Sequence, residues 1–190
     1  MAGILSLGSK FFKNKLFLTR TLAWIGVFIY MLVIFCFSSH EADKSDSISK
    51  AVVRNIIRWT PKFGGIQEYL ASNMGILNHL LRKCAHFVEF FILSMLIAHA
   101  FKKTGAGSLK GLLFSVFICA LYSCVDELHQ RFVPGRGPGI KDVAIDIFGA
   151  IFAVAIIFLK RAIKKVRYHE IKYNSKQWSL QSLQNGIKTK

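Results

Sequence analysis

Apolar residues gather in four long runs separated by polar stretches, and each run is long enough to cross a bilayer. The runs cover approximately residues 21–38, 84–101, 109–126 and 141–159. A hydrocarbon core of about 30 Å needs roughly 17 to 25 mostly apolar residues in a helix. The pattern therefore predicts an all-α protein, an integral membrane bundle of four transmembrane helices.

The segment between the first two runs has a different pattern. In SISKAVVRNIIRW, apolar residues recur every three or four positions and basic residues repeat on another face. The apolar positions are Ile48, Val52, Ile56 and Trp59, and the basic positions are Lys50, Arg54 and Arg58. This amphipathic pattern is typical of a helix that lies flat in the membrane interface. We expect an outer interfacial helix that ends before Pro61.

The distribution of lysine and arginine predicts the orientation. Residues 1–20, 102–110 and 160–190 hold 16 of the 26 basic residues and only one acidic residue. Short loops rich in basic residues stay in the cytoplasm. The chain is thus expected to have a basic cytoplasmic N-terminus (1–20), a membrane domain (21–160) and a basic cytoplasmic tail whose last 20 residues are loosely ordered (161–190).

The formal net charge of +16 is also typical of nucleic-acid-binding proteins. Topology already explains where the basic residues fall, and each one near the membrane attracts anionic lipids by about 1 kcal/mol. We therefore expect membrane lipids, and no nucleic acid, as partners. The sequence leaves the oligomeric state and any cofactor open.

Ionisable residues concentrate near the outer ends of the last three spans. On the second span Arg82, His86 and Glu89 share one helical face, because they are spaced by four and three residues. The third span leaves the membrane through YSCVDELHQRF, and the fourth opens with Asp142 and Asp146 on one stripe. Carboxylates at this depth should face protein, since lipid exposure costs several kcal/mol per charge. We expect one polar pocket at the extracytoplasmic surface of the cell membrane.

Ordered motifs in these segments resemble the VanZ-like family of membrane proteins. They are Lys83-x-x-His86-Phe87-x-Glu89-Phe90-x-x-Leu93, Asp126-Glu127-x-His129-Gln130, Pro134-Gly135-Arg136, Asp142-Val143 with Asp146, and Gly149-Ala150, with Phe37-Ser38-Ser39 closing the first span. The resemblance covers about residues 20–160, and it departs at Gly139, where a serine is expected. It implies a role in the cell envelope, since the founding member is associated with resistance to the glycopeptide teicoplanin.

The functional hypothesis is a pocket where hydrolysis or transfer occurs at a lipid-linked phosphate or glycan, with a glycopeptide antibiotic as another expected ligand. The candidates for headgroup binding are Arg82, Lys83, His129, Gln130 and Arg136. The catalytic candidates are His86, Glu89, Asp126, Glu127, Asp142 and Asp146. Arginine suits a phosphate because its guanidinium donates two parallel hydrogen bonds, and histidine with a carboxylate suits general acid and base catalysis.

Three other interpretations stay open at this point. The charged residues can hold the helices together in a non-enzymatic binding or structural protein. His86 and Glu89, with Asp126 and Asp142, resemble the spacing of metal sites in bundles, but no histidine pair has a familiar ligand spacing and Arg136 would repel a cation. Intramembrane carboxylates can also relay protons in a transporter, although here the charges gather at one surface.

Overall fold

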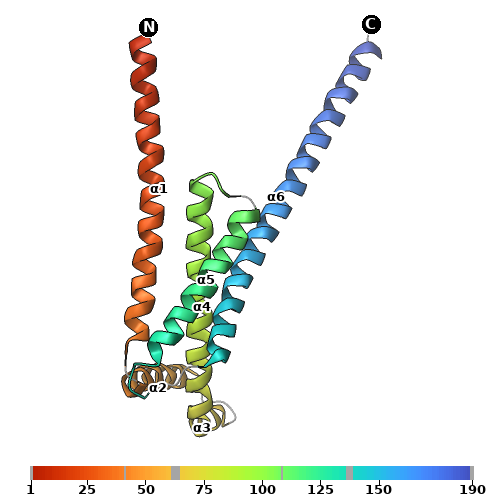
Figure 1. The fold of residues 1–190 in the computed structure, drawn as a ribbon. Coiled ribbons are helices and arrows are strands. Elements are labelled where there is room, and N and C mark those ends of the chain that lie inside the picture. The colour runs from red at the N-terminus through yellow and green to blue at the C-terminus, as the bar shows by residue number, and fades with distance from the viewer. Residues whose placement is uncertain (1, 41, 61–64, 108, 136–138, 189–190) are drawn as a thin grey trace. The chain divides into compact units, whose positions relative to one another are not determined.

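The computed structural model describes residues 2–40, 42–60, 65–107, 109–135 and 139–188, and these residues form helices joined by short turns (Figure 1). The helices are α1 (Ala2–Ser38), α2 (Ala42–Trp59), α3 (Ile66–Ser72), α4 (Met74–Lys103), α5 (Leu109–Gln130) and α6 (Ile140–Lys188). The all-α prediction is confirmed. By compactness the chain divides into residues 1–154 and residues 155–190.

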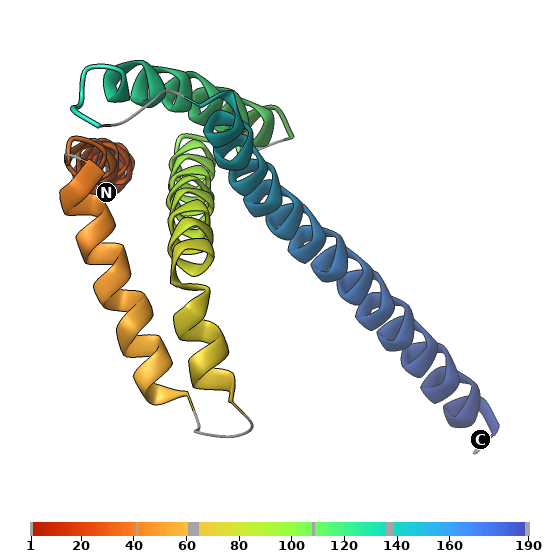
Figure 2. The same cartoon turned by 90° about the horizontal axis from the view of Figure 1, so that it is seen from below.

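Helices α2 and α3 lie side by side across the end of the bundle where α1 ends and α4 begins (Figure 2). The Gln67 side chain joins them, because its amide donates hydrogen bonds to the carbonyl oxygens of Ile57 and Thr60. Val53 is buried, whereas the predicted apolar row stays exposed, up to 89% for Trp59. An amphipathic helix with an uncovered apolar row is the arrangement expected at a membrane interface.

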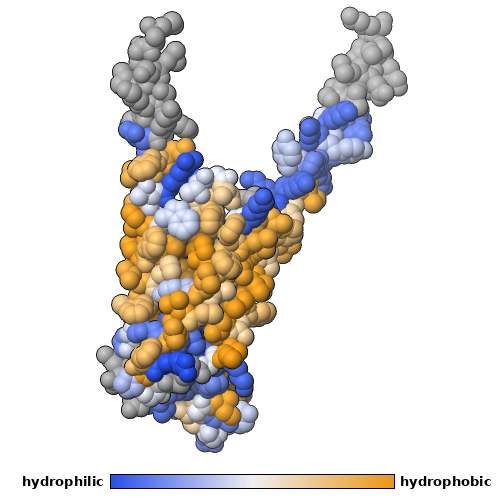
Figure 3. Space-filling view, in the orientation of Figure 1, coloured by the Kyte–Doolittle hydropathy of each residue, from blue (hydrophilic) through white to orange (hydrophobic). Residues whose placement is uncertain are grey.

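Within the described residues, four helices are long and apolar enough to cross a membrane. They cover Asn14–Ser38, Met74–Lys103, Leu109–Gln130 and Ile140–Trp178, and they contain the four predicted windows. Large apolar side chains such as Phe28 and Phe117 are exposed on the outside of the first unit, and apolar residues form a band across it (Figure 3). The chain is a multi-pass membrane protein.

Helix α4 is the centre of the first unit. Phe90, Leu93 and Ile97 on α4 are fully buried against Ile34 of α1 and Cys119 of α5. The polar hydroxyl of a buried serine, Ser94, also crosses to α6, where it donates a hydrogen bond to the carbonyl oxygen of Ala150 over 3.1 Å. The first four turns of α6 are therefore part of this packed unit.

Small residues allow α6 to approach α4 closely. Ala150 and Ala153 are fully buried, as expected for a stripe that faces protein. A methyl group added at Gly149 would overlap the carbonyl oxygen of Phe87, so the two backbones nearly touch there. This close approach brings the carboxylates at the start of α6 to the polar residues of α4.

The expectation of a loosely ordered C-terminus is wrong, because α6 continues as a helix to Lys188. The segment contains no proline, and its only glycine after Gly149 is Gly186. Lysine, glutamine and leucine have good helix propensity, and nothing in the segment breaks the helix that the membrane span begins. In the second unit, the described side chains after Lys160 are almost all exposed.

Candidate functional site

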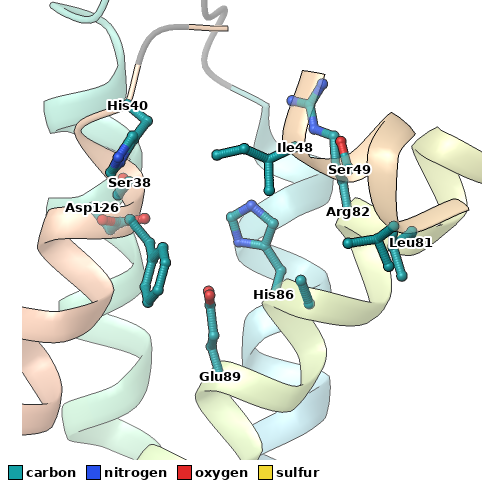
Figure 4. A pocket seen from close by; sticks show the side chains of 12 residues that line it. Ser38, His40, Ile48, Ser49, Leu81, Arg82, His86, Glu89 and Asp126 are labelled. Atoms are coloured by element: carbon teal, nitrogen blue, oxygen red, sulfur yellow. The ribbon is translucent and has the colours of Figure 1, made fainter. Parts of the chain in front are cut away.

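A cavity of about 370 Å³ lies between α1, α2, α4 and α5, near the end of the bundle that α2 crosses (Figure 4). Its polar lining comes from Ser38, His40, Ser49, Arg82, His86, Glu89 and Asp126. Its apolar lining comes from Phe37, Ile48, Val52, Leu81 and Ala85. The cavity is therefore amphipathic, with ionisable groups beside an apolar wall.

Local helix geometry gives each residue its place in this cavity. Arg82, His86 and Glu89 reach it together from α4, so the predicted shared face is confirmed. Asp126 comes from the last turns of α5, at the same depth. Since a helix rises about 1.5 Å per residue, Arg82 and Glu89 lie roughly 10 Å apart along α4. Arg82 lies beside Ser49 of α2, Asp126 lies across the cavity beside Ser38, and Glu89 lies farther along α4 (Figure 4).

Asp126 is the most buried ionisable group of the cavity, with only 3% of the residue exposed. Its Oδ2 accepts a hydrogen bond of 2.8 Å from the side-chain amide of Gln130, which also donates to the hydroxyl of Ser38 over 2.9 Å. Its Oδ1 is buried and has no hydrogen-bond donor among the described residues. A buried acceptor without a donor costs roughly 1–3 kcal/mol.

His86 stands between the cavity and α6. Its Nδ1 lies 3.3 Å from Oδ1 of Asp146, close enough for an ion pair but not aligned as a hydrogen bond. Asp146 is 1% exposed, and its Oδ2 accepts a hydrogen bond of 2.7 Å from the hydroxyl of Ser123. Asp146 is thereby fixed beside one edge of the imidazole while the ring lines the cavity. A carboxylate in this position selects the orientation and tautomer of a histidine.

Three other predicted site residues connect the start of α6 to α4 and α5 instead of lining the cavity. The Lys83 ammonium forms an ion pair with the carboxylate of Asp142. The carboxylate of Glu127 accepts a hydrogen bond from the backbone N–H of Gly139. Each contact ties one end of the α5–α6 connection to the bundle.

The remaining candidates lie elsewhere. His129 Nε2 is 3.1 Å from the hydroxyl of Ser39, and its ring packs against Phe35 with centroids 4.4 Å apart. Gln130 does not line the cavity itself, but it donates hydrogen bonds to two residues that do, Asp126 and Ser38. Arg136 lies outside the described residues. The structure thus brings Arg82, His86, Glu89 and Asp126 together, with Gln130 and Asp146 behind them.

Sequence reasoning missed three polar residues that support this site. Ser123 precedes Asp126 by three residues on the buried face of α5, so the same helical spacing would have identified it. Asn78 precedes Arg82 by four residues on α4, and its side-chain amide donates to the carboxylate of Asp46 on α2. The pairing of Asp46 with Asn78 has no sequence signal, because it depends on how α2 docks.

Asp46 also forms an ion pair with Lys50, over 2.6 Å between Oδ2 and Nζ. The hydrogen bond from Lys50 is the largest cause of a lowered pKa at Asp46, and the bond from Asn78 acts in the same direction. The carboxylate is therefore held in its charged form where α2 meets α4, next to the cavity.

Within the described ranges, no group of three or more His, Cys, Asp or Glu side chains is arranged to hold a metal ion. Asp142, one of the ligands in the metal interpretation, is the partner of Lys83. The described geometry gives that interpretation no support.

The comparisons with known proteins address the family. Residues 23–161 match the family model described as VanZ/LLP1, a range that includes every residue around the cavity. Neither the curated proteins nor the solved structures gave a match.

Proposed function

The chain belongs to the VanZ/LLP1 family, as its motifs predicted, and on this premise we propose that it binds the headgroup of a lipid-linked phosphate or glycan outside the cell. The family also links the chain to the cell envelope and to antibiotic resistance. In this proposal the cavity of α1, α2, α4 and α5 opens to the outer leaflet, and a change at the headgroup underlies glycopeptide resistance of the teicoplanin type.

One observation carries the proposal: Arg82, His86, Glu89 and Asp126 meet in a single cavity that also has an apolar wall. Ionisable groups at membrane depth are costly and usually mark a ligand or ion pathway. A ligand with a polar head and an apolar tail matches both parts of the lining. Interhelical polar contacts average only about 0.6 kcal/mol, too little to explain four such groups in one cavity.

The orientation rests on charge. Arg20 of α1 donates a hydrogen bond of 3.0 Å to the carbonyl oxygen of Lys103 at the end of α4, so these basic ends lie together. The cavity lies at the opposite ends of the same two helices, near Ser38 and Arg82. Since the basic ends are expected in the cytoplasm, we place the cavity at the extracytoplasmic side.

The chemistry we propose uses two residues one helical turn apart on α4, Arg82 and His86. Arg82 holds a phosphate oxygen, for which a guanidinium has suitable geometry. His86, oriented by Asp146, takes a proton from a water or hydroxyl nucleophile as that nucleophile attacks the phosphate and the bond to the leaving group breaks. Binding without this step is the second candidate, favoured by the structural pairing of Lys83 with Asp142 beside the cavity.

The test compares His86→Ala, Glu89→Gln and Asp126→Asn with the controls His99→Ala and Glu68→Gln, whose side chains are exposed away from the cavity. We expect all five variants to insert and to keep the melting temperature within a few degrees. Only the three cavity variants should lose the glycopeptide tolerance that the wild type gives a susceptible host. Failure of these three to accumulate would instead favour a purely structural role.

A second assay separates an enzyme from a binding protein. Purified protein is incubated with polyprenyl phosphates and lipid-linked glycans, and the products are analysed by mass spectrometry. A changed product mass that requires His86 identifies an enzyme, whereas retention without conversion identifies a binding protein. If no member of either lipid class is retained or converted, the proposed ligand class is wrong.

A further inference from the structure

The charges around the cavity do not suit a phosphate alone. Among its described lining residues, Arg82 is the one permanent cation, while Glu89 and Asp126 are both acidic. Lys83, the neighbouring cation, is paired with Asp142. We call the part of the cavity formed by Glu89 and Asp126 its inner end. A phosphate there would meet two carboxylates, and like charges at close range repel strongly where water is scarce. The inner end favours a cation or a hydrogen-bond donor.

A second observation points to a donor on the ligand. Asp126 is 97% buried, it lines the cavity, and its Oδ1 has no donor within the described part of the chain. The side-chain amide of Gln130 donates its hydrogen bond to the other oxygen, Oδ2. Phosphate oxygens only accept hydrogen bonds at neutral pH, whereas an ammonium donates up to three and adds opposite charge. An ammonium would donate to Oδ1 of Asp126, and its charge is opposite to that of the two carboxylates.

The arrangement along α4 separates the two ends of such a ligand. Arg82 lies two helical turns from Glu89, on the side where the apolar residues Ile48 and Leu81 line the cavity (Figure 4). A phosphate at Arg82 would leave its acyl chains next to this apolar wall. The ammonium that follows the phosphate in the headgroup would then point inward.

We propose that the cavity recognises a zwitterionic amphiphile, with its phosphate at Arg82 and a protonated amine between Glu89 and Asp126. The inference rests on the proposed function, because it concerns the same cavity, and it specifies the class of headgroup. It predicts discrimination between headgroups that differ only in their amine.

The experiment measures lipid retention by the purified full-length protein with native mass spectrometry. Phosphatidylethanolamine, phosphatidylcholine and phosphatidylglycerol with identical acyl chains compete at equal concentration. Phosphatidylcholine keeps the positive charge but has no N–H, and phosphatidylglycerol has no cation. We expect phosphatidylethanolamine to be retained about tenfold over each of the others, as expected for one charge-assisted hydrogen bond.

Variants test the residues. Asp126→Asn and Glu89→Gln should reduce this preference to about twofold or less, since one such bond corresponds to roughly tenfold. The matched control Glu68→Gln should keep it. Arg82→Gln should weaken all three lipids, and its control Arg58→Gln should not. Free phosphoethanolamine, added as a competitor, identifies the source: displacement indicates recognition of the headgroup alone, and its absence indicates that the acyl chains are needed.

Equal retention of the three lipids by the wild type would overturn the ammonium inference, and so would a preference for phosphatidylglycerol. This comparison needs no variant, so it holds even if Asp126→Asn does not fold. If Arg82→Gln still weakened retention in that case, headgroup binding in the cavity would stand. If no lipid depended on any cavity residue, the headgroup proposal would fall as well.

Discussion

Two faces of the N-terminal half of α4 differ in the partners of their charged residues. Toward α6, Lys83 pairs with Asp142, and Asp146 is held by Ser123 beside His86. Toward α1 and α2, Arg82 and Glu89 line a cavity. We call these the α6 face and the cavity face. Arg82 and Lys83 are neighbours of equal charge, yet about 100° of helical rotation places them on different faces.

The same division occurs on α5. Asp126 lines the cavity, and its Oδ1 has no donor among the described residues, whereas the carboxylate of Glu127 accepts a hydrogen bond from the backbone N–H of Gly139 at the start of α6. Charges on the α6 face find partners inside the protein and contribute to its stability. On the cavity face, the Oδ1 of Asp126 is expected to find its hydrogen-bond donor in a ligand. Stability measurements can therefore separate the two faces without knowledge of the ligand.

The largest effect is expected on the α6 face at Gly149. The substitution Gly149→Ala adds a Cβ that overlaps the backbone carbonyl of Phe87, so α4 and α6 must separate. Overpacking of this kind costs about 1–3 kcal/mol, which lowers the melting temperature by roughly 3–10 °C in a chain of this size. Thermal unfolding in detergent measures the shift.

Gly26 on α1 is the matched control for Gly149, because a Cβ there meets nothing within 4 Å. Gly26→Ala should leave the protein equally or slightly more stable, since alanine has the better helix propensity. Similar losses for both alanine variants would mean that close packing of α4 on α6 is not what distinguishes this face.

A smaller effect is expected from the ion pair of Lys83 and Asp142, which is about four-fifths buried. Asp142→Asn leaves the ammonium without its carboxylate and should cost about 2 kcal/mol, less than for a fully buried pair because water still reaches Lys83. The double variant Lys83→Met with Asp142→Leu should recover most of that loss. If the losses of stability in the single variants Lys83→Met and Asp142→Leu add up to the loss in the double variant, the two side chains are not coupled.

Much of the fold and part of the candidate site could be predicted from the sequence. Hydropathy gave the four spans, helical spacing gave the shared face of Arg82, His86 and Glu89, and the motifs gave the family. These features depend on local periodicity and on the energetic cost of charge in lipid. Both produce a pattern of apolar and charged residues that can be recognised in a single sequence.

The assignment of charges to faces could not be predicted. The sequence pattern groups Lys83 with Arg82 as a headgroup ligand and Asp142 with Asp126 as a catalytic group, but Lys83 and Asp142 pair with each other. A difference of one residue decides which neighbouring helix a side chain meets, and that depends on how α4 and α6 are rotated in the bundle. Composition and spacing do not fix that rotation.

On the cavity face, removal of a charge should have little effect on stability or increase it. Asp126→Asn keeps the side-chain shape and removes the charge of a carboxylate whose Oδ1 has no donor in the described structure. We expect the free energy of unfolding to rise by less than about 1 kcal/mol, because a buried charge whose Oδ1 has no donor is removed. Chemical denaturation in mixed micelles measures it, with Glu68→Gln as the control. A loss of several kcal/mol would place Asp126 with the structural charges of the α6 face.

The smallest effect is expected at Asp46, which joins α2 to α4 through Asn78, pairs with Lys50 on its own helix and is about one-third exposed. Its pKa is lowered from 3.8, chiefly by the hydrogen bond from Lys50. A lowered pKa contributes stability that is fully present above pH 3.8 and is lost as the pH falls through the folded-state value. The contribution should stay below about 1 kcal/mol because solvent screens the pair.

Spin labels at the exposed positions Arg54 and His79 should give a distance distribution that broadens below pH 3.8 or in Asp46→Asn, but not in Glu68→Gln. An unchanged distance distribution in Asp46→Asn at neutral pH would mean that the buried Val53 alone docks α2. The contacts of Asp46 would then have no part in closing this side of the cavity.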